Sequence, residues 1–243
     1  MKTVLITGAT SGIGQQLALD YLKDGWQVLA CGRNTEKLAA LKAHNPTHCQ
    51  TLSFDVTKRE AVLVAGESIT QALDLVILNA GTSIYIDDAK HFDSERFSRL
   101  MHTNLLGIGY CLEAFTRHIP AGGQLALVGS SAYLFPFTRA EAYGASKAAI
   151  AYLAQSLSLD LKKHGIAVSL ITPGFVQTPL TDQNDFPMPM RIPVAQASTD
   201  IRRGLAKRKA LISTPASFVF ALRLLNRLPY SLQLWLGQRI LRS

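Results

Sequence analysis

Tyr143 and Lys147 are the two residues whose types and spacing most directly suggest chemistry. Residues four apart lie on the same face of a helix, one turn above the other. A free phenol has a pKa of about 10, so at neutral pH it is a poor acid-base group. An ammonium group held beside it, with a second cation close by, favours the phenolate and lowers that pKa. The pair therefore indicates proton transfer near neutral pH.

A glycine-rich turn lies at the other end of the chain. Residues 2–6 predict a short buried strand, residues 15–24 predict a helix, and the turn between them carries Gly8, Gly12 and Gly14. Glycines let the backbone approach a pyrophosphate closely, and the N-terminus of the following helix offers free N–H groups. The glycine spacing differs from the most common one, but the strand–turn–helix context is that of a dinucleotide-binding site.

Together with further motifs, these two segments resemble the short-chain dehydrogenase/reductase family, in its compact single-domain branch. The resemblance extends from about residue 1 to about residue 178. Its other motifs are Asp55 with Val56, the segment 79–81, Asn104, Ser130 and the segment 173–178. The resemblance implies a doubly wound α/β Rossmann fold, with a parallel sheet of about seven strands and helices on both faces.

Length and composition agree with one domain. The chain has 243 residues, of which 48% are hydrophobic, and this is enough to bury one sizeable core. Short apolar runs alternate with helical patterns, as in βαβ units on a parallel sheet. The predicted strands are 4–7, 27–31, 51–55, 73–78, 123–129 and 167–172, with 210–212 as a possible last strand. We therefore expect residues 1–243 to form a single dinucleotide-binding catalytic domain.

The resemblance also implies roles for individual residues. Tyr143 takes the place of the general acid-base, and Lys147 would lower its pKa and bind the nicotinamide ribose. Ser130 would hold the substrate oxygen, and Asn104 would kink a helix and anchor a proton-relay water. The implied cofactor-binding set is Gly8, Thr10, Ser11, Gly12, Ile13, Gly14, Arg33, Asn34, Asp55, Val56, Asn79, Ala80, Gly81, Tyr143, Lys147, Pro173, Gly174, Val176 and Thr178.

The choice of cofactor depends on the end of the second predicted strand. An acidic residue there would hold the ribose 2′-hydroxyl of NAD. The position is occupied by Gly32, and Arg33 follows it. No carboxylate repels a 2′-phosphate at this point, and a guanidinium is present to pair with one. The sequence therefore predicts NADP(H), with a purely structural turn at Arg33 as the alternative.

Beyond residue 178 the chain departs from the common family pattern. The segment 179–200 is rich in Pro and Met and predicts a substrate lid with an adaptable apolar surface. Residues 216–243 predict two amphipathic basic helices, 216–228 and 231–241, separated by Pro229. Residues 201–243 hold nine Lys or Arg and no Asp or Glu, so the net charge of +8 belongs to this end.

Two interpretations of the C-terminal helices remain open. Basic residues on Leu-, Phe- and Trp-containing helices are typical of segments that lie on a membrane surface. Alternatively, the apolar stripes cover the substrate cavity or a dimer interface and leave the arginines in water. No apolar run approaches the roughly 20 residues of a membrane-spanning helix.

The expected function is NADP(H)-dependent interconversion of an apolar ketone or aldehyde and its alcohol. Tyr133, Leu134, Phe135, Phe137 and Phe175 flank predicted catalytic positions, which favours an apolar substrate. One alternative is an epimerase or dehydratase, because that branch of the family keeps the Tyr–Lys pair. The other is a non-enzymatic NADP-sensing interaction protein.

The remaining expectations concern partners and location. We expect a homo-oligomer, most simply a dimer, and no nucleic acid partner, because no recognition module accompanies the basic charge. His44, His48 and Cys49 are better explained by a solvated loop than by a metal site. Three cysteines without paired spacing suit the cytoplasm, and the glycine turn begins too close to residue 1 for a preceding signal peptide.

Overall fold

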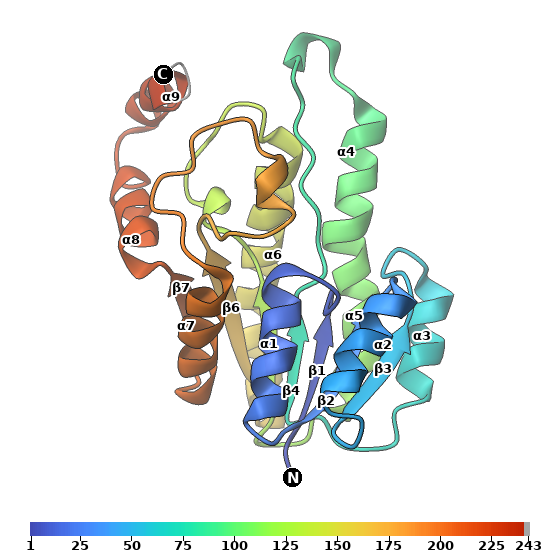
Figure 1. The fold of residues 1–243 in the computed structure, drawn as a ribbon. Helices are drawn as coiled ribbons and strands as arrows, with labels where there is room; N and C mark the ends of the chain where they lie inside the picture. Colours follow the sequence, from blue (N-terminus) through green and yellow to red (C-terminus); the bar gives the residue numbers. More distant parts are fainter. Residues whose placement is uncertain (241–243) are drawn as a thin grey trace.

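A seven-stranded parallel sheet forms the centre of the protein (Figure 1). The structure, a computed structural model, describes residues 1–240. The strand order is β3-β2-β1-β4-β5-β6-β7, and every neighbouring pair is parallel. The strands are β1 (Thr3–Thr7), β2 (Gln27–Gly32), β3 (Cys49–Ser53), β4 (Leu75–Leu78), β5 (Gln124–Val128), β6 (Ala167–Pro173) and β7 (Leu211–Thr214). The predicted doubly wound fold is confirmed, and the order reverses between β1 and β4.

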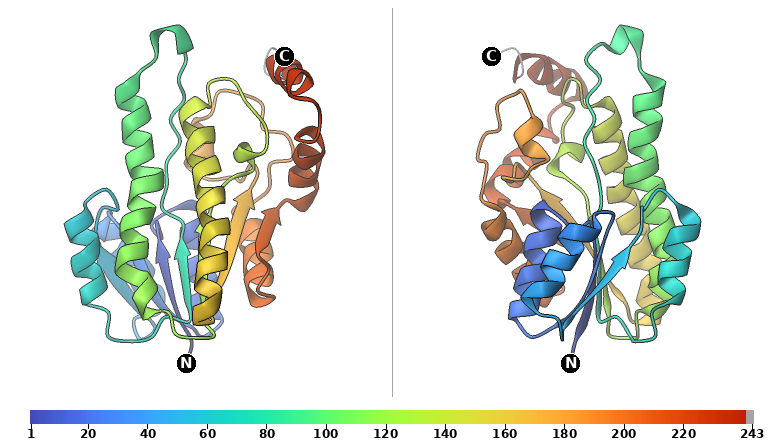
Figure 2. Two further views of the ribbon diagram at one scale, coloured as in Figure 1. Left: turned by 180° about the vertical axis from the view of Figure 1, so that it is seen from behind. Right: turned by 45° about the vertical axis from the view of Figure 1, so that its right-hand side comes forward.

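Helices cover both faces of this sheet, so the strands are buried on both sides and read as continuous apolar runs. One face carries α1 (Gly12–Lys23), α2 (Thr35–His44) and α7 (Val194–Ala206). The other carries α3 (Arg59–Glu67), α4 (Ser94–Met101), α5 (Gly107–Phe115) and α6 (Glu141–Asp160). Two apolar cores result, one on each side of the sheet (Figure 2).

Two predicted boundaries shift by a few residues. The first helix begins at Gly12 and not at residue 15, because the end of the glycine turn is already its first helical turn. The third strand is displaced toward the N-terminus, since its pairing with β2 ends where Gly32 meets Ser53. Asp55 therefore lies beyond the strand, in the connection to α3, and its side chain can face the edge of the sheet.

The C-terminal part divides differently from the prediction. Residues 194–200 of the predicted lid belong to α7, which packs against α1, so only 179–193 form a connection over the sheet edge. The predicted helix pair becomes α8 (Ala216–Leu225) and α9 (Tyr230–Ile240), with Pro229 between them. Residue 241 and Arg242 lie outside the described residues. Within 1–240, no helix is both long and apolar enough to cross a membrane.

The basic residues of this region also separate into two groups. Arg202, Arg203, Lys207, Arg208 and Lys209 lie on α7 or just after it, at the amino end of the sheet (Figure 1). Arg223, Arg227 and Arg239 lie on or beside α8 and α9, and α9 stands at the opposite end of the molecule (Figure 1). The eight basic residues that the structure describes in 201–240 therefore do not form one continuous surface.

Candidate active site

A cleft of about 710 Å³ opens at the carboxyl edge of the sheet, around the point where the strand order reverses. Ligands of open α/β sheets bind at this location. Of the predicted site residues, the cleft is lined by Gly8, Thr10, Ser11, Gly12, Ile13, Arg33, Asp55, Val56, Asn79, Ala80, Gly81, Ser130, Tyr143, Lys147, Pro173, Gly174, Val176 and Thr178. Gly14, Asn34 and Asn104 are not part of its lining.

Polar contacts join the glycine turn to the end of β4. The Thr7 hydroxyl accepts hydrogen bonds from the backbone N–H groups of Asn79 and Ala80, both at 3.0 Å. The Asn79 amide donates to the Thr7 carbonyl at 2.9 Å. A Cβ on Gly14 would lie 2.3 Å from the Gly8 carbonyl oxygen. Gly14 therefore serves close packing, and the Asn79 side chain holds the turn in place.

Gly8 shows why this turn needs glycine. Its φ is +67°, in the left-handed region that side chains disfavour. A Cβ there would also meet the Ala80 Cα at 2.9 Å. The turn thus passes directly over the end of β4 and leaves its backbone facing the cleft.

The far end of the cleft holds a cation. Arg33 is 76% exposed, and its Nη1 lies 3.4 Å from Oδ2 of Asp55. Burial works to raise the pKa of the Asp55 carboxyl, but hydrogen bonds from Thr57 and the Arg33 charge hold it below its usual value. Asn34, predicted to bind cofactor, instead caps α2 by accepting a hydrogen bond from the Lys37 N–H at 2.8 Å.

The space around Gly32 explains the missing acid. A Cβ at this position would lie 2.6 Å from Cγ2 of Thr10 in the glycine turn. An aspartate that could hold a ribose 2′-hydroxyl would therefore require Thr10 to move. The two positions are 22 residues apart, so sequence spacing did not reveal this contact.

Three of the four predicted catalytic residues, Ser130, Tyr143 and Lys147, line the middle of the cleft. Tyr143 and Lys147 share one face of α6, with Nζ 5.6 Å from the centre of the tyrosine ring. The Lys147 ammonium donates to the Val128 carbonyl at 3.1 Å, at the end of β5. Ser130 follows β5, and its hydroxyl accepts a hydrogen bond from the Ala132 N–H at 3.1 Å.

Burial dominates the proton affinities of this pair. It raises the pKa of Tyr143 to about 12, against the opposing effect of a hydrogen bond with Ser130. It lowers the pKa of Lys147 to about 8. The predicted lowering of the Tyr143 pKa by Lys147 is therefore absent from the protein alone. Both groups lose water, and Nζ is directed to a carbonyl oxygen instead of the phenol.

Asn104 connects three elements behind the cleft. It is fully buried in a π-helical segment (His102–Leu106) between α4 and α5. Its amide nitrogen donates to the Thr82 carbonyl at 2.9 Å and to the Ser146 hydroxyl at 3.1 Å, while its oxygen accepts from the Thr82 N–H at 2.8 Å. Ser146 in turn donates to the Tyr143 carbonyl at 2.8 Å. These contacts make Asn104 a positioning residue for α6, and its water-anchoring role stays a prediction.

The cleft also includes residues that the sequence analysis missed. Arg99 and Thr103 of the α4 region line it, and they lie one helical turn apart immediately before Asn104. Their spacing of four residues, which puts both on one face of this helix, is the signal that could have grouped them. On the opposite side, residues 179–181 and Gln183, which belong to the predicted lid 179–200, contribute to the lining.

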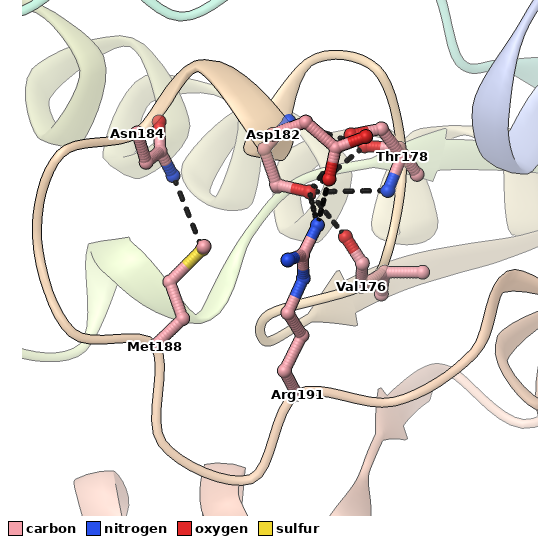
Figure 3. A network of polar contacts seen from close by, with 7 residues as sticks. Val176, Thr178, Asp182, Asn184, Met188 and Arg191 are labelled. Atoms are coloured by element: carbon pink, nitrogen blue, oxygen red, sulfur yellow. Dashed lines mark hydrogen bonds and ion pairs between the residues drawn. The ribbon is translucent and has the colours of Figure 1, made fainter.

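A hydrogen-bond network fixes the connection 179–193 beside the cleft (Figure 3). The Thr181 hydroxyl accepts hydrogen bonds from the Thr178 N–H and from Arg191, each at 3.1 Å, and it also contacts the Val176 carbonyl. Arg191 forms an ion pair with Asp182. Because both ends of the connection are tied to the segment after β6, it can cover the cleft with only one short 3-10 helix (Thr181–Gln183) of its own.

The aromatic residues that flank Ser130 do not line the cleft. Leu134 and Phe135 are buried, and together with Tyr133, Phe137 and Phe175 they pack against α8 and α9. Their apolar character therefore serves to attach the C-terminal helices. Within residues 1–240, no group of three or more His, Cys, Asp or Glu side chains could hold a metal ion.

The lowered pKa of Lys147 predicts a pH-dependent stability. Between about pH 8 and 10.5 the unfolded chain keeps a proton on this lysine that the folded protein has lost, so stability rises with pH in this window. Relative to Lys147→Met, the wild type should gain about 2 kcal/mol of unfolding free energy between about pH 7 and 9.5. Denaturant unfolding at both pH values measures this.

The comparison with Lys147→Met is needed because other groups act in the opposite direction. Burial raises the pKa of the Cys31 and Cys111 thiols, so their ionisation in the unfolded chain lowers stability above about pH 8.5. Both proteins share this loss, and it cancels in the difference. Equal pH dependence of the two proteins would show that burial does not lower the pKa of Lys147.

Comparisons with known proteins agree with this geometry. A family model described as short chain dehydrogenase matches residues 2–187. An uncharacterized oxidoreductase of Myxococcus xanthus is 34% identical over 236 residues, covering 94% of this chain and 93% of that protein. An NADP-dependent 3-hydroxy acid dehydrogenase of Salmonella typhi is 31% identical over 182 residues, covering 71% of this chain and 72% of that protein.

A solved structure extends the likeness to the fold. It is a short-chain dehydrogenase from Sphingobium yanoikuyae in complex with NADPH, with a TM-score of 0.80 at 24% identity, covering 89% of each chain. The residues that the family model matches, 2–187, include the glycine turn and the Tyr143–Lys147 pair. This chain belongs to the short-chain dehydrogenase/reductase family of oxidoreductases.

Proposed function

We propose that this protein is an NADP(H)-dependent oxidoreductase that interconverts an apolar ketone or aldehyde and the corresponding alcohol. The observation that carries the proposal is the arrangement of the cleft. A glycine turn and a cation lie at one side of it, and a tyrosine, a lysine and a serine lie together further along. The first group suits a phosphorylated dinucleotide, and the second suits proton transfer to a carbonyl oxygen.

The residues present fit the cofactor. Gly8 and Gly12 leave the backbone open to a pyrophosphate at the start of α1, where the helix N-terminus favours negative charge. Arg33 offers a guanidinium for a 2′-phosphate, and its exposed position allows it to leave Asp55 for a doubly charged partner. The bound cofactor would supply the hydride.

Three residues handle the oxygen and its proton. The Ser130 hydroxyl donates a hydrogen bond to the substrate oxygen, and the Tyr143 O–H donates the proton as negative charge develops there. Lys147 stabilises the resulting phenolate through its positive charge. Asn104 acts through Ser146 by fixing the backbone of α6 at Tyr143. In the oxidative direction the same groups accept the proton.

An apolar substrate is favoured by aromatic side chains on the two loops that border the cleft, 79–88 and 179–193. Tyr85 and Phe186 meet edge to face with ring centres 5.3 Å apart, and Phe175 lies 6.2 Å from Phe186. Apolar side chains also surround Tyr143 from the α4 side, namely Ile84, Ile86, Phe97 and Met101.

The protein is proposed to act in the cytoplasm as a homodimer. Cys31, Cys49 and Cys111 are free and buried, as expected in a reducing compartment. Leu106, Tyr152 and Leu159 are exposed apolar residues on the helical layer of α5 and α6, and they offer a face for a second copy. A monomer in sedimentation velocity would contradict the dimer.

The substrate class predicts a trend with chain length. In assays of NADPH oxidation, kcat/KM should rise along a series of aliphatic aldehydes and ketones, because each buried CH₂ contributes about 0.8 kcal/mol. Serine-derived and 3-hydroxy acid substrates, assayed in the oxidative direction with NADP+, provide the polar comparison. Faster turnover of the polar compounds would refute the apolar assignment, and tight NADPH binding without any turnover would favour an NADP-sensing protein.

Tyr143→Phe tests the acid-base assignment. The ring still packs on α6, but the proton donor is lost, so turnover should fall by about 10²- to 10⁴-fold while NADPH binding is kept. Tyr152→Phe is the control, because this tyrosine lies on the same helix and is 76% exposed. Steady-state assays and a fluorescence titration of NADPH measure the two properties. Turnover within a few-fold of wild type would exclude Tyr143 as the acid.

Arg33→Ala tests the choice of cofactor. Loss of the guanidinium should raise KM for NADPH on the order of 10-fold and leave KM for NADH nearly unchanged, because only NADPH carries the 2′-phosphate. Lys37→Ala removes an exposed cation from the adjoining helix and should change neither value. A wild type that prefers NADH, or an equal effect on both cofactors, would end this assignment.

A further inference from the structure

The two C-terminal helices expose an apolar surface. We define the α8–α9 surface as the exposed large apolar side chains Phe220, Leu224, Tyr230, Leu232, Leu234 and Trp235. Phe220 is 61% exposed and Tyr230 75% exposed, so neither is a partly covered core residue. Single exposed apolar residues are ordinary, but six on two consecutive helices mark an interaction site.

Other residues of α8 and α9 are packed against the domain. Phe218, Val219 and Leu222 of α8 are buried against Leu134 and Phe135. In α9, Leu236 packs against the same cluster, and a Cβ on Gly237 would meet the Pro136 carbonyl at 2.9 Å. Each helix therefore uses one face to attach to the domain and leaves its other apolar residues exposed.

The charges on this surface have one sign. The exposed Arg227 and Arg239 accompany the apolar residues, and residues 216–240 contain no Asp or Glu. Arg223 is partly buried and donates a hydrogen bond to the Ser213 hydroxyl of β7 at 3.3 Å, so it is directed toward the sheet. The Arg239 guanidinium lies 4.2 Å from the centre of the Trp235 ring, so a cation and an indole form one unit. Trp beside Arg on an amphipathic helix is characteristic of the membrane–water interface.

The one-signed charge also argues against a second copy of the chain as the partner. In a two-fold symmetric contact the same patch meets itself, so arginine would face arginine with no acidic residue between them. An anionic partner avoids this repulsion. The remaining basic residues, on and after α7, lie at the other end of the molecule and do not belong to this surface (Figure 1).

We propose that the α8–α9 surface binds the surface of an anionic lipid bilayer. The apolar side chains enter the interfacial layer, while Arg227 and Arg239 pair with lipid phosphates. Docking in this way sets the carboxyl edge of the sheet toward the lipid, because α9 stands at that end of the molecule (Figures 1 and 2). The inference does not depend on the reaction, since binding is measured without turnover.

Fluorescence of Trp235 tests the proposal directly. The chain has two tryptophans, so Trp26→Phe leaves Trp235 as the only reporter. At low salt, vesicles of phosphatidylcholine with phosphatidylglycerol should shift its emission to the blue and carry the protein into the pellet. Added salt should weaken binding, because exposed charges are screened within about 10 Å at 0.1 M. No shift and no sedimentation at low salt would overturn the proposal, as would equal binding to pure phosphatidylcholine.

Matched charge reversals identify the surface that binds. Arg227→Glu with Arg239→Glu should reduce vesicle partitioning at least about 30-fold, at roughly 1 kcal/mol per basic residue. Lys207→Glu with Lys209→Glu makes the same change in net charge at the α7 end and should have a much smaller effect. Equal losses in the two variants would overturn the assignment to α8–α9. If the wild type does not bind vesicles and Arg227→Glu with Arg239→Glu changes its oligomeric state in sedimentation velocity, the surface contacts a second copy of the chain. That outcome would also overturn the proposal.

Discussion

The contact between the glycine turn and the end of β4 is the constraint on which the cleft depends. The Thr7 hydroxyl accepts hydrogen bonds from two backbone N–H groups after β4, and the Asn79 side-chain amide donates a hydrogen bond to the Thr7 carbonyl. These hydrogen bonds satisfy backbone groups that would otherwise lack a partner beyond the end of the pairing between β1 and β4. Because Gly8 and Gly14 have no side chains, the turn can lie against β4 and present its backbone to the cleft.

A second polar network positions the reactive residues. Asn104 sits in a π-helical segment, and such segments often mark functional sites because they rotate side chains out of the regular helical pattern. Here the rotated amide reaches both the segment after β4 and Ser146 of α6. The order of α6 at Tyr143 and Lys147 thus depends on a buried amide that never reaches the cleft. Burial of the pair also sets their proton affinities, which the spacing of the two residues could not reveal.

The C-terminal part shows how one segment of sequence can serve several ends. The aromatic run after β5 was expected to face substrate, but it provides the platform for α8 and α9. An aromatic contact beside the cleft comes instead from Tyr85 and from Phe186 of the connection 179–193. That connection is held by Arg191 and Thr181 and not by packing alone, so its conformation rests on a few polar contacts (Figure 3).

The sequence by itself determined the fold class, the family and about half of the cleft residues, because apolar periodicity and the spacing of glycine, tyrosine and lysine are local properties. It could not determine contacts between distant segments. The collision of any Gly32 side chain with Thr10, the capping role of Asn34 and the use of the Asn79 amide all depend on which atoms meet across the sheet edge.

The distribution of basic residues over the surface, like these contacts, could not be determined from the sequence. The sequence placed the basic excess in residues 201–243. Only the tertiary structure showed that the five basic residues on α7 and just after it lie at one end of the molecule, while those on and beside α8 and α9 lie away from them. Net charge adds along a chain, whereas the field at a surface depends on distance, and distances are decided by packing.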